Sequence, residues 1–260
     1  MNRDEQTVHK LACMEVWGGN RKVARPVELP DLAGWVYSTP LEPGTGGGDL
    51  HYLSVCNGGL LSRVALADVM GHGQLASSLA EKLRELMHKH INTWDQSTFV
   101  RELSHAFQQE TTAGEYATFV VLGFHRQKGQ VIYTNAGHLT PLWYHRAEKK
   151  WDLLEENTPH AKTEVAGLPL GLISGTGYSQ TTVQLAPGDL LVLYTDGLTE
   201  ATDKAGEELG SERFLELAHA LPVDSPAAAG EALLAAVHAF RNGAPASDDE
   251  TLVVLQRLIA

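Results

Sequence analysis

The chain of 260 residues has little cysteine, no long apolar run and few positive charges. Its two cysteines, Cys13 and Cys56, are too few for the disulfide framework that stabilises small secreted domains. Residues 1–6 lack the apolar core of a signal peptide. No stretch approaches the roughly 20 apolar residues that a membrane-spanning helix requires. We therefore expect a cytoplasmic protein without a membrane partner.

Negative charge dominates, with 32 Asp and Glu against 20 Lys and Arg, which gives a net charge of −12. This balance argues against nucleic-acid binding, because such proteins need clustered cations to displace counterions. The length and the 43% hydrophobic content suit one large domain with a sizeable core. We expect an N-terminal segment at residues 1–30 and a catalytic domain at residues 31–260.

Apolar periodicity predicts both helices and strands. Two helices are expected at residues 74–90 and 96–109, and two more at 211–220 and 226–240. In the first of them, the apolar face comprises Leu75, Leu79, Leu83, Leu86 and Met87. Strands are expected at residues 35–37, 49–55, 60–66, 117–124, 131–135, 142–145, 181–185, 190–194 and 251–257, with a hairpin turn at Asn57-Gly58. Surface loops are expected at residues 147–177 and 202–210. This order favours a layered α+β sandwich over alternating βαβ units.

Four aspartates stand beside turn-forming residues at the ends of apolar runs: Asp49, Asp68, Asp196 and Asp248. A single aspartate at a turn is most often a cap or a turn former. Several carboxylates that converge at one end of a sheet, with no Lys or Arg beside them in the sequence, instead suit a hard divalent cation. The pattern therefore indicates a metal-dependent hydrolase.

Five ordered motifs strengthen this interpretation. They are Asp-Val-Met-Gly-His-Gly at 68–73, Asn-Ala-Gly-His-Leu-Thr-Pro at 135–141, Gly-Leu-Pro-Leu-Gly-Leu at 167–172, the Pro-Gly-Asp to Thr-Glu-Ala run at 187–201, and Asp-Asp-Glu-Thr-Leu-Val-Val at 248–254. Together they resemble the metal-dependent protein phosphatases of the PPM family (type 2C), and more narrowly the bacterial SpoIIE and RsbU-like branch. The resemblance covers the chain from about residue 46 onward.

The resemblance implies a four-layer α-β-β-α sandwich with two central antiparallel sheets and two Mn²⁺ or Mg²⁺ ions at one end. In that scheme Asp68 bridges both ions and the main-chain carbonyl of Val69 binds one of them. Asp49 completes one ion's ligands, while Asp196 and Asp248 hold the other ion. A metal-activated water then attacks phosphorus without a covalent enzyme intermediate.

Other residues carry open alternatives. His72 is a candidate general acid for the leaving serine oxygen, or a histidine that packs the turn. His138 is expected to support a strand turn by hydrogen bonds. Asp249 is expected to support the ligands rather than to bind metal, and Glu200 to face solvent. Tyr52 stands where many relatives carry a further acid, so the ligand count of one metal stays open.

The expected activity is hydrolysis of phosphoserine or phosphothreonine, with an anti-sigma-factor antagonist as the substrate that the resemblance implies. Since no arginine precedes Asp49 as it does in eukaryotic relatives, the metals must hold the substrate phosphate. A regulatory partner or a second copy is expected on the helices that follow Asp68. The alternatives are a catalytically inactive binding module with this fold, or a hydrolase of small phosphorylated metabolites. A cysteine phosphatase is excluded because Arg63 is one position too late after Cys56, and a P-loop because no Gly-Lys-Ser or Gly-Lys-Thr follows the glycines at 44–48.

Overall fold

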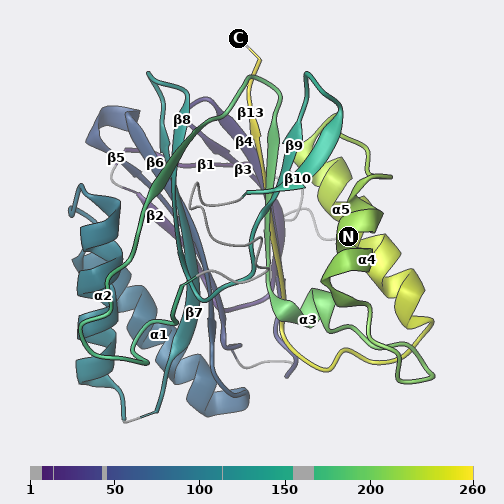
Figure 1. Cartoon of the computed structure of the whole chain (residues 1–260), viewed down its shortest axis with the longest axis horizontal. Helices are drawn as coiled ribbons and strands as arrows, with labels where there is room; N and C mark the ends of the chain where they lie inside the picture. The colour runs from purple at the N-terminus through teal and green to yellow at the C-terminus, as the bar shows by residue number, and fades with distance from the viewer. Residues whose placement is uncertain (1–7, 14, 43–45, 113, 155–166, 260) are drawn as a thin grey trace.

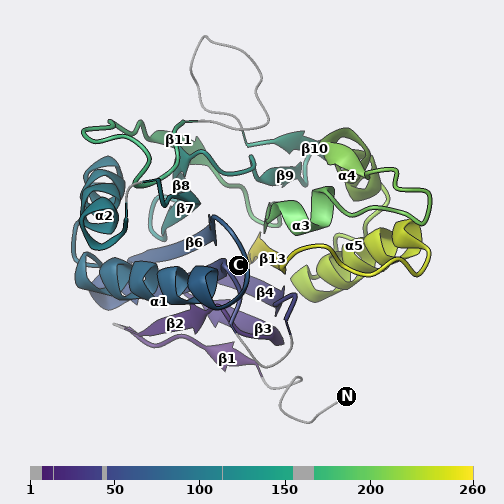
Figure 2. The same cartoon turned by 90° about the horizontal axis from the view of Figure 1, so that it is seen from below.

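The computed structural model describes residues 8–13, 15–42, 46–112, 114–154 and 167–259. Two sheets are stacked face to face, and helices cover both outer faces (Figures 1 and 2). This arrangement confirms the expected α-β-β-α sandwich. Within the described ranges, no helix combines the length and the apolar character needed to cross a membrane.

The first sheet contains six strands, all paired antiparallel, in the order β11-β8-β7-β6-β5-β2. Its strands are β2 (Val16–Gly19), β5 (Asp49–Cys56), β6 (Leu61–Val69), β7 (Ala117–His125), β8 (Gln130–Ala136) and β11 (Thr181–Gln184). The turn between β5 and β6 holds Asn57 and Gly58 at φ of 51° and 65°. Asparagine and glycine tolerate this left-handed region, so the predicted hairpin is confirmed.

The second sheet contains seven strands in the order β1-β3-β4-β13-β12-β9-β10. Its strands are β1 (His9–Lys10), β3 (Val23–Leu29), β4 (Leu32–Thr39), β9 (Leu142–His145), β10 (Lys150–Leu153), β12 (Leu190–Tyr194) and β13 (Glu250–Arg257). Only the short β1–β3 pair among the described strands is parallel. The central strands β13 and β12 are apolar on both faces, because one face meets the other sheet and one meets helices.

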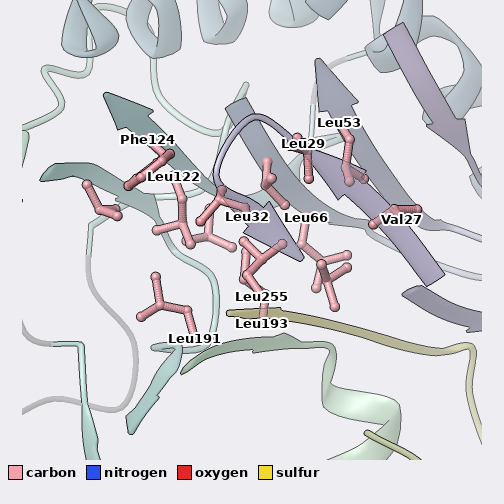
Figure 3. Packing of buried hydrophobic residues seen from close by; sticks show 14 of the residues in the cluster. Val27, Leu29, Leu32, Leu53, Leu66, Leu122, Phe124, Leu191, Leu193 and Leu255 are labelled. Atoms are coloured by element: carbon pink, nitrogen blue, oxygen red, sulfur yellow. The ribbon is translucent and has the colours of Figure 1, made fainter. Parts of the chain in front are cut away.

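Alternation along the strands divides the apolar residues among three cores. Leu53 and Leu66 point between the sheets into a cluster that also contains Leu122, Leu193 and Leu255 (Figure 3). Neighbouring residues such as Tyr52 and Ala65 point to the opposite face, against the helices. A third cluster lies between the seven-stranded sheet and the C-terminal helices.

The first helical layer consists of α1 (Gly73–Lys89) and α2 (Gln96–Glu110). The buried apolar residues of α1 follow helical spacing: Ala76, Leu79, Ala80, Leu83, Leu86 and Met87. Leu75 was expected among them, but its side chain is 63% exposed. Leu75 lies in the first turn of α1, where Ala76 is the buried apolar residue instead. Buried Arg63 donates hydrogen bonds to the carbonyls of Ile91, Thr93 and Trp94, which fixes the connection between the two helices.

The second helical layer consists of α4 (Gly210–Ala218) and α5 (Pro226–Arg241), and the short α3 (Asp196–Thr199) follows β12 directly. Ser225 caps α5 by accepting from the Ala228 amide, and Pro226 occupies the first turn, where its missing N–H costs nothing. Arg241 at the end of α5 pairs with buried Glu250 and donates to the Gly197 carbonyl at 3.0 Å. These bonds tie α5 to α3.

Residues 16–29, which the sequence placed in a separate N-terminal segment, form strands of both sheets. β2 pairs with β5 over four residues, and β3 pairs with β4 over seven. We therefore propose that the domain begins near residue 8 rather than at residue 31. The predicted loop at 147–177 contains β10, while residues 155–166 of it lie outside the described residues.

Candidate functional site

Asp49 and Asp68 face each other at one end of the six-stranded sheet. They are direct partners in the β5–β6 register, Asp49 opening its strand and Asp68 next to last in its own. Asp49 is 3% exposed, and burial followed by the Asp68 charge raises its pKa well above the usual range. Burial, then the charges of Asp196 and Asp248, raises the pKa of Asp68 to about 8.

Asp196 and Asp248 approach the same place from the seven-stranded sheet. Asp196 is the first residue of α3, directly after β12, and Asp248 lies just before β13. Burial, followed by the charges of Glu200 and Asp248, raises the pKa of Asp196 to about 6. The pKa of Asp248 is also raised, first by burial. The structure thus brings all four predicted aspartates to one end of the sandwich, close enough for their charges to interact.

Close backbone approaches at this end require glycine. A Cβ atom added to Gly197 would lie 2.0 Å from the carbonyl oxygen of Asp249, and one added to Gly48 would lie 2.8 Å from that of Val69. The Val69 amide also donates to the Gly48 carbonyl at 3.3 Å. The main chain of Val69 therefore lies beside the glycine loop that leads into Asp49.

Asp249 accepts hydrogen bonds from the backbone instead of joining the acidic cluster as an open carboxylate. Its Oδ1 accepts from the Leu41 amide and its Oδ2 from the Gly48 amide, both at 2.6 Å. These bonds hold the loop before Asp49 against the start of β13. The expectation that Asp249 supports the ligands is in line with this geometry.

Thr195 links Asp49 to the opposite sheet, a role that the sequence analysis missed. Its Oγ1 donates to Asp49 Oδ2 at 2.7 Å and accepts from the Thr251 amide at 3.0 Å. The Thr195 side chain is fully buried. The one available signal was its place directly before Asp196 in the Tyr-Thr-Asp-Gly motif.

His138 is a structural residue, as the sequence predicted. Its Nε2 donates to the Tyr194 carbonyl at 3.1 Å and its Nδ1 accepts from the Thr118 hydroxyl at 2.8 Å, so the ring connects the two sheets. Asn135 closes the turn by accepting from the His138 amide and donating to its carbonyl. Burial lowers the pKa of His138 to about 4, which keeps the ring neutral.

His72 lies at the exposed start of α1, in the extended position before the first helical residue. Its charge lowers the pKa of Asp248, so the ring lies near the acidic cluster. Glu200 is exposed, as expected, and burial followed by the Glu208 charge raises its pKa. Tyr52 packs among the residues under α1 and α2, on the helix side of the sheet, and supplies no acid to the site.

The donor set suits a hard cation, since it offers only carboxylate and carbonyl oxygens. In the part of the chain that the structure describes, no Lys or Arg forms an ion pair with any of the four aspartates. Among the described residues, no group of three or more Asp, Glu, His or Cys side chains is already arranged to bind a metal ion. The acids therefore form a cluster of carboxylates whose charges repel one another.

The sequence model of the family described as "Stage II sporulation protein E (SpoIIE)" matches residues 61–258. This match covers most of the chain. The chain belongs to the SpoIIE family. Among curated relatives, the phosphoserine phosphatase RsbU of Bacillus subtilis is 28% identical over 145 residues, which are 55% of this chain and 40% of RsbU. The phosphoserine phosphatase RsbP of the same organism is 26% identical over 144 residues, 54% of this chain and 33% of RsbP. The chain thus spans less than half of either relative.

Solved structures of low identity share the fold. The RsbU and RsbW domains of a Mycobacterium tuberculosis protein superpose with a TM-score of 0.73 at 24% identity, covering 92% of this chain and 63% of that one. The type 2C phosphatase domain of SpoIIE from Bacillus subtilis gives 0.72 at 21% identity, covering 86% and 63%. The catalytic domain of the serine/threonine protein phosphatase PstP in complex with two manganese ions gives 0.59 at 18% identity, covering 88% and 99%. These likenesses confirm the type 2C fold.

Proposed function

We propose that the chain is a metal-dependent protein phosphatase that hydrolyses phosphoserine or phosphothreonine. The observation that carries this proposal is the convergence of four aspartates from two sheets, buried or half-buried and without a cationic partner among the described residues. Burial disfavours the charged form of these carboxylates, and a bound divalent cation would offset that cost. Membership of the SpoIIE family and the likeness to RsbU and RsbP support the reaction type.

Two Mn²⁺ or Mg²⁺ ions are the cofactor that we assign to this site. Asp68 and the carbonyl of Val69, with Asp49, would hold one ion, and Asp68 with Asp196 and Asp248 would hold the other. Bound metal supplies a water acidified to hydroxide near neutral pH and charge that neutralises the phosphate. The complex of PstP with two manganese ions supports this ion class.

Hydrogen bonds from residues around the site orient the acids. The Thr195 hydroxyl fixes one oxygen of Asp49, and Asp249 fixes the loop before it through the Gly48 amide. We assign to His72, which is exposed and whose charge acts on Asp248, the role of giving a proton to the serine oxygen as the phosphate ester breaks. Serine is a poor leaving group without that proton, so the role can be tested by comparing hydrolysis of phosphoserine with that of an aryl phosphate.

The substrate that we assign is a phosphorylated anti-sigma-factor antagonist in a partner-switching pathway. The association of an RsbU domain with an RsbW domain in one Mycobacterium tuberculosis structure supports this class. Control by a partner, or by a second copy of the chain, is assigned to the exposed face of α1 and to α2. Lys82 and Lys89 lie on that face, and Lys82 donates to the Glu110 carbonyl at the end of α2. Since α1 begins four residues after Val69, movement of this helix would displace the site.

The test is phosphate release from a phosphoserine peptide and from an aryl phosphate, with Mn²⁺ and with EDTA. Asp68→Asn and Asp196→Asn should each abolish Mn²⁺-dependent turnover while the protein stays folded in a thermal melt. Asp224→Asn is the matched control, because Asp224 is an exposed carboxylate before α5. Turnover retained by either site variant would refute the assignment. Wild-type protein that cleaves only the aryl phosphate would favour a metabolite hydrolase, and no turnover of either substrate would favour an inactive binding module.

A further inference from the structure

A cleft of about 460 Å³ opens at the edge strand β2, away from the acidic cluster. One wall is the exposed side of α1, and another is the turn between β2 and β3. Trp17, Gly18, Gly19 and His51 also line the cleft. Small-molecule sites commonly span about 300–1,000 Å³, so this cleft, which we term the β2 cleft, is large enough for a metabolite.

Three cations line the β2 cleft: Arg21, Lys22 and Arg84. All three are exposed, and none forms an ion pair or a hydrogen bond with any residue that the structure describes. Such a group of unpaired cations stands out on a chain with a net charge of −12. Glu81 and Glu85 lie on the α1 wall and oppose part of this charge. The cations therefore have room to accept an anion from solution.

His51 provides a second, independent sign of a ligand. Its side chain is 3% exposed, and its Nδ1 has no hydrogen-bond partner within the described ranges. The ring lies 5.3 Å from that of Trp17, which is only half-buried and offers an apolar surface to the cleft. Buried polar atoms in folded proteins are nearly always paired, so an unpaired imidazole nitrogen beside a cationic cleft suits an oxygen-bearing ligand.

We propose that the β2 cleft binds a small anionic metabolite, whose phosphate or carboxylate groups contact Arg21, Lys22 and Arg84 and whose oxygen pairs with His51. Arginine and lysine favour such groups because charge-assisted hydrogen bonds are stronger than neutral ones. The apolar part of the ligand lies against Trp17. Glu81 and Glu85 limit the affinity for simple anions.

The cleft contacts the loop that carries Asp49. Buried Asn20, which also lines the cleft, donates from its side chain to the Gly47 carbonyl at 3.0 Å and to Ser77 Oγ of α1 at 3.1 Å. Its own carbonyl accepts from the Gly47 amide at 2.8 Å. A ligand that moves the β2–β3 turn therefore moves the glycine loop beside Asp49. This regulatory consequence depends on the proposed function, whereas binding of the anion does not.

The experiment follows the imidazole nitrogen signals of the whole chain by NMR during titration with sodium sulfate or sodium succinate, with sodium chloride at equal ionic strength as the background. The His51 signals are assigned with His51→Gln. Sulfate represents a phosphate group and succinate a carboxylate, so the two arms separate the sources. We expect a saturable shift of His51 with one of them and none with chloride.

Variants make the test specific. Arg21→Ala and Arg84→Ala should each weaken binding by up to about fivefold, the loss of an exposed charge pair. Glu85→Gln should tighten it, because a repelling charge is removed. Lys89→Ala, exposed on the same helix outside the cleft, is the control and should leave binding unchanged.

The proposal is overturned if His51 does not respond to either anion, or if saturation is equal in wild type, Arg84→Ala and Glu85→Gln. The link to the loop is measured separately, as a shift of the Gly47 and Gly48 amides on saturation. Performing this step on Asp68→Asn protein removes turnover from the measurement. A failure of the cleft is then distinguishable from a failure of the phosphatase assignment.

Discussion

Removing the Thr195 hydroxyl tests whether links between the sheets position the acids. Thr195→Val keeps the shape of the side chain but loses the bond to Asp49 Oδ2 and leaves the Thr251 amide without its acceptor. A buried donor left unpaired costs about 1–3 kcal/mol of stability. Loss of a group that orients a metal ligand lowers metal affinity by about 10–100-fold. We therefore expect both a lower melting temperature and a higher Mn²⁺ requirement.

Thr195→Ser is the matched variant, since it keeps the hydroxyl and removes only a methyl group. The assay is a Mn²⁺ titration of phosphoserine-peptide turnover, combined with thermal melts in EDTA and in saturating Mn²⁺. The serine variant should keep a Mn²⁺ dependence close to wild type, while the valine variant recovers much of its turnover only at high Mn²⁺. The reasoning is refuted if Thr195→Val titrates like wild type, or if Thr195→Ser loses as much Mn²⁺ affinity as the valine variant.

Further predictions concern His72, His138 and α1. His72→Ala should slow hydrolysis of a phosphoserine peptide by about 10²–10⁴-fold yet spare an aryl phosphate; equal losses on both would assign His72 a structural role. His138 stays neutral when folded, with a pKa lowered to about 4, while the unfolded chain takes up its proton below about 6.5. The contribution of His138 to stability should therefore fall between pH 6.5 and 4 by up to about 3 kcal/mol, measured in EDTA as the difference between wild type and His138→Gln in denaturant titrations at each pH. Charge reversal of Lys82 and Lys89 should alter partner-stimulated activity or self-association but not basal turnover at saturating Mn²⁺; unchanged behaviour in both assays would remove α1 from regulation.

Much of the fold was predictable because its strands and helices obey simple periodicity. Residues 61–69 and 117–125 are long and apolar, and α5 begins with a serine cap and a proline. β2 escaped prediction because two of its four residues are glycine, which disfavours strands. β3 contains Pro26, which is tolerated because β1 pairs only with residues 27 and 28 on that side. β2 is stabilised by pairing with β5, which is distant in sequence, and β3 by pairing with the next strand, β4, rather than by their own propensity.

The acids of the site were predictable from the sequence because burying a carboxylate is energetically unfavourable. A buried carboxylate such as Asp49 has a raised pKa and needs a partner, so its place at the end of an apolar strand departs from ordinary patterns. The residues that orient the acids show no such departure in the sequence. Thr195 and Asn20 are buried, neutral and hydrogen-bonded, and their partners lie up to 146 and 57 residues away in sequence.

Asp249 shows how the two kinds of residue differ within a single motif. It follows Asp248 directly and has the same carboxylate, yet it receives amide hydrogen bonds from Leu41 and Gly48. Those donors engage both oxygens of Asp249, whereas Asp248 accepts one amide hydrogen bond, from Asp249 to its Oδ1 at 2.7 Å, and burial raises its pKa. The motif thus identifies both aspartates as candidate site residues. The hydrogen bonds that each one accepts then decide which carboxylate is left to bind a cation. The amides that donate to Asp249 belong to residues about 200 positions away in sequence, so only the folded structure distinguishes the two roles.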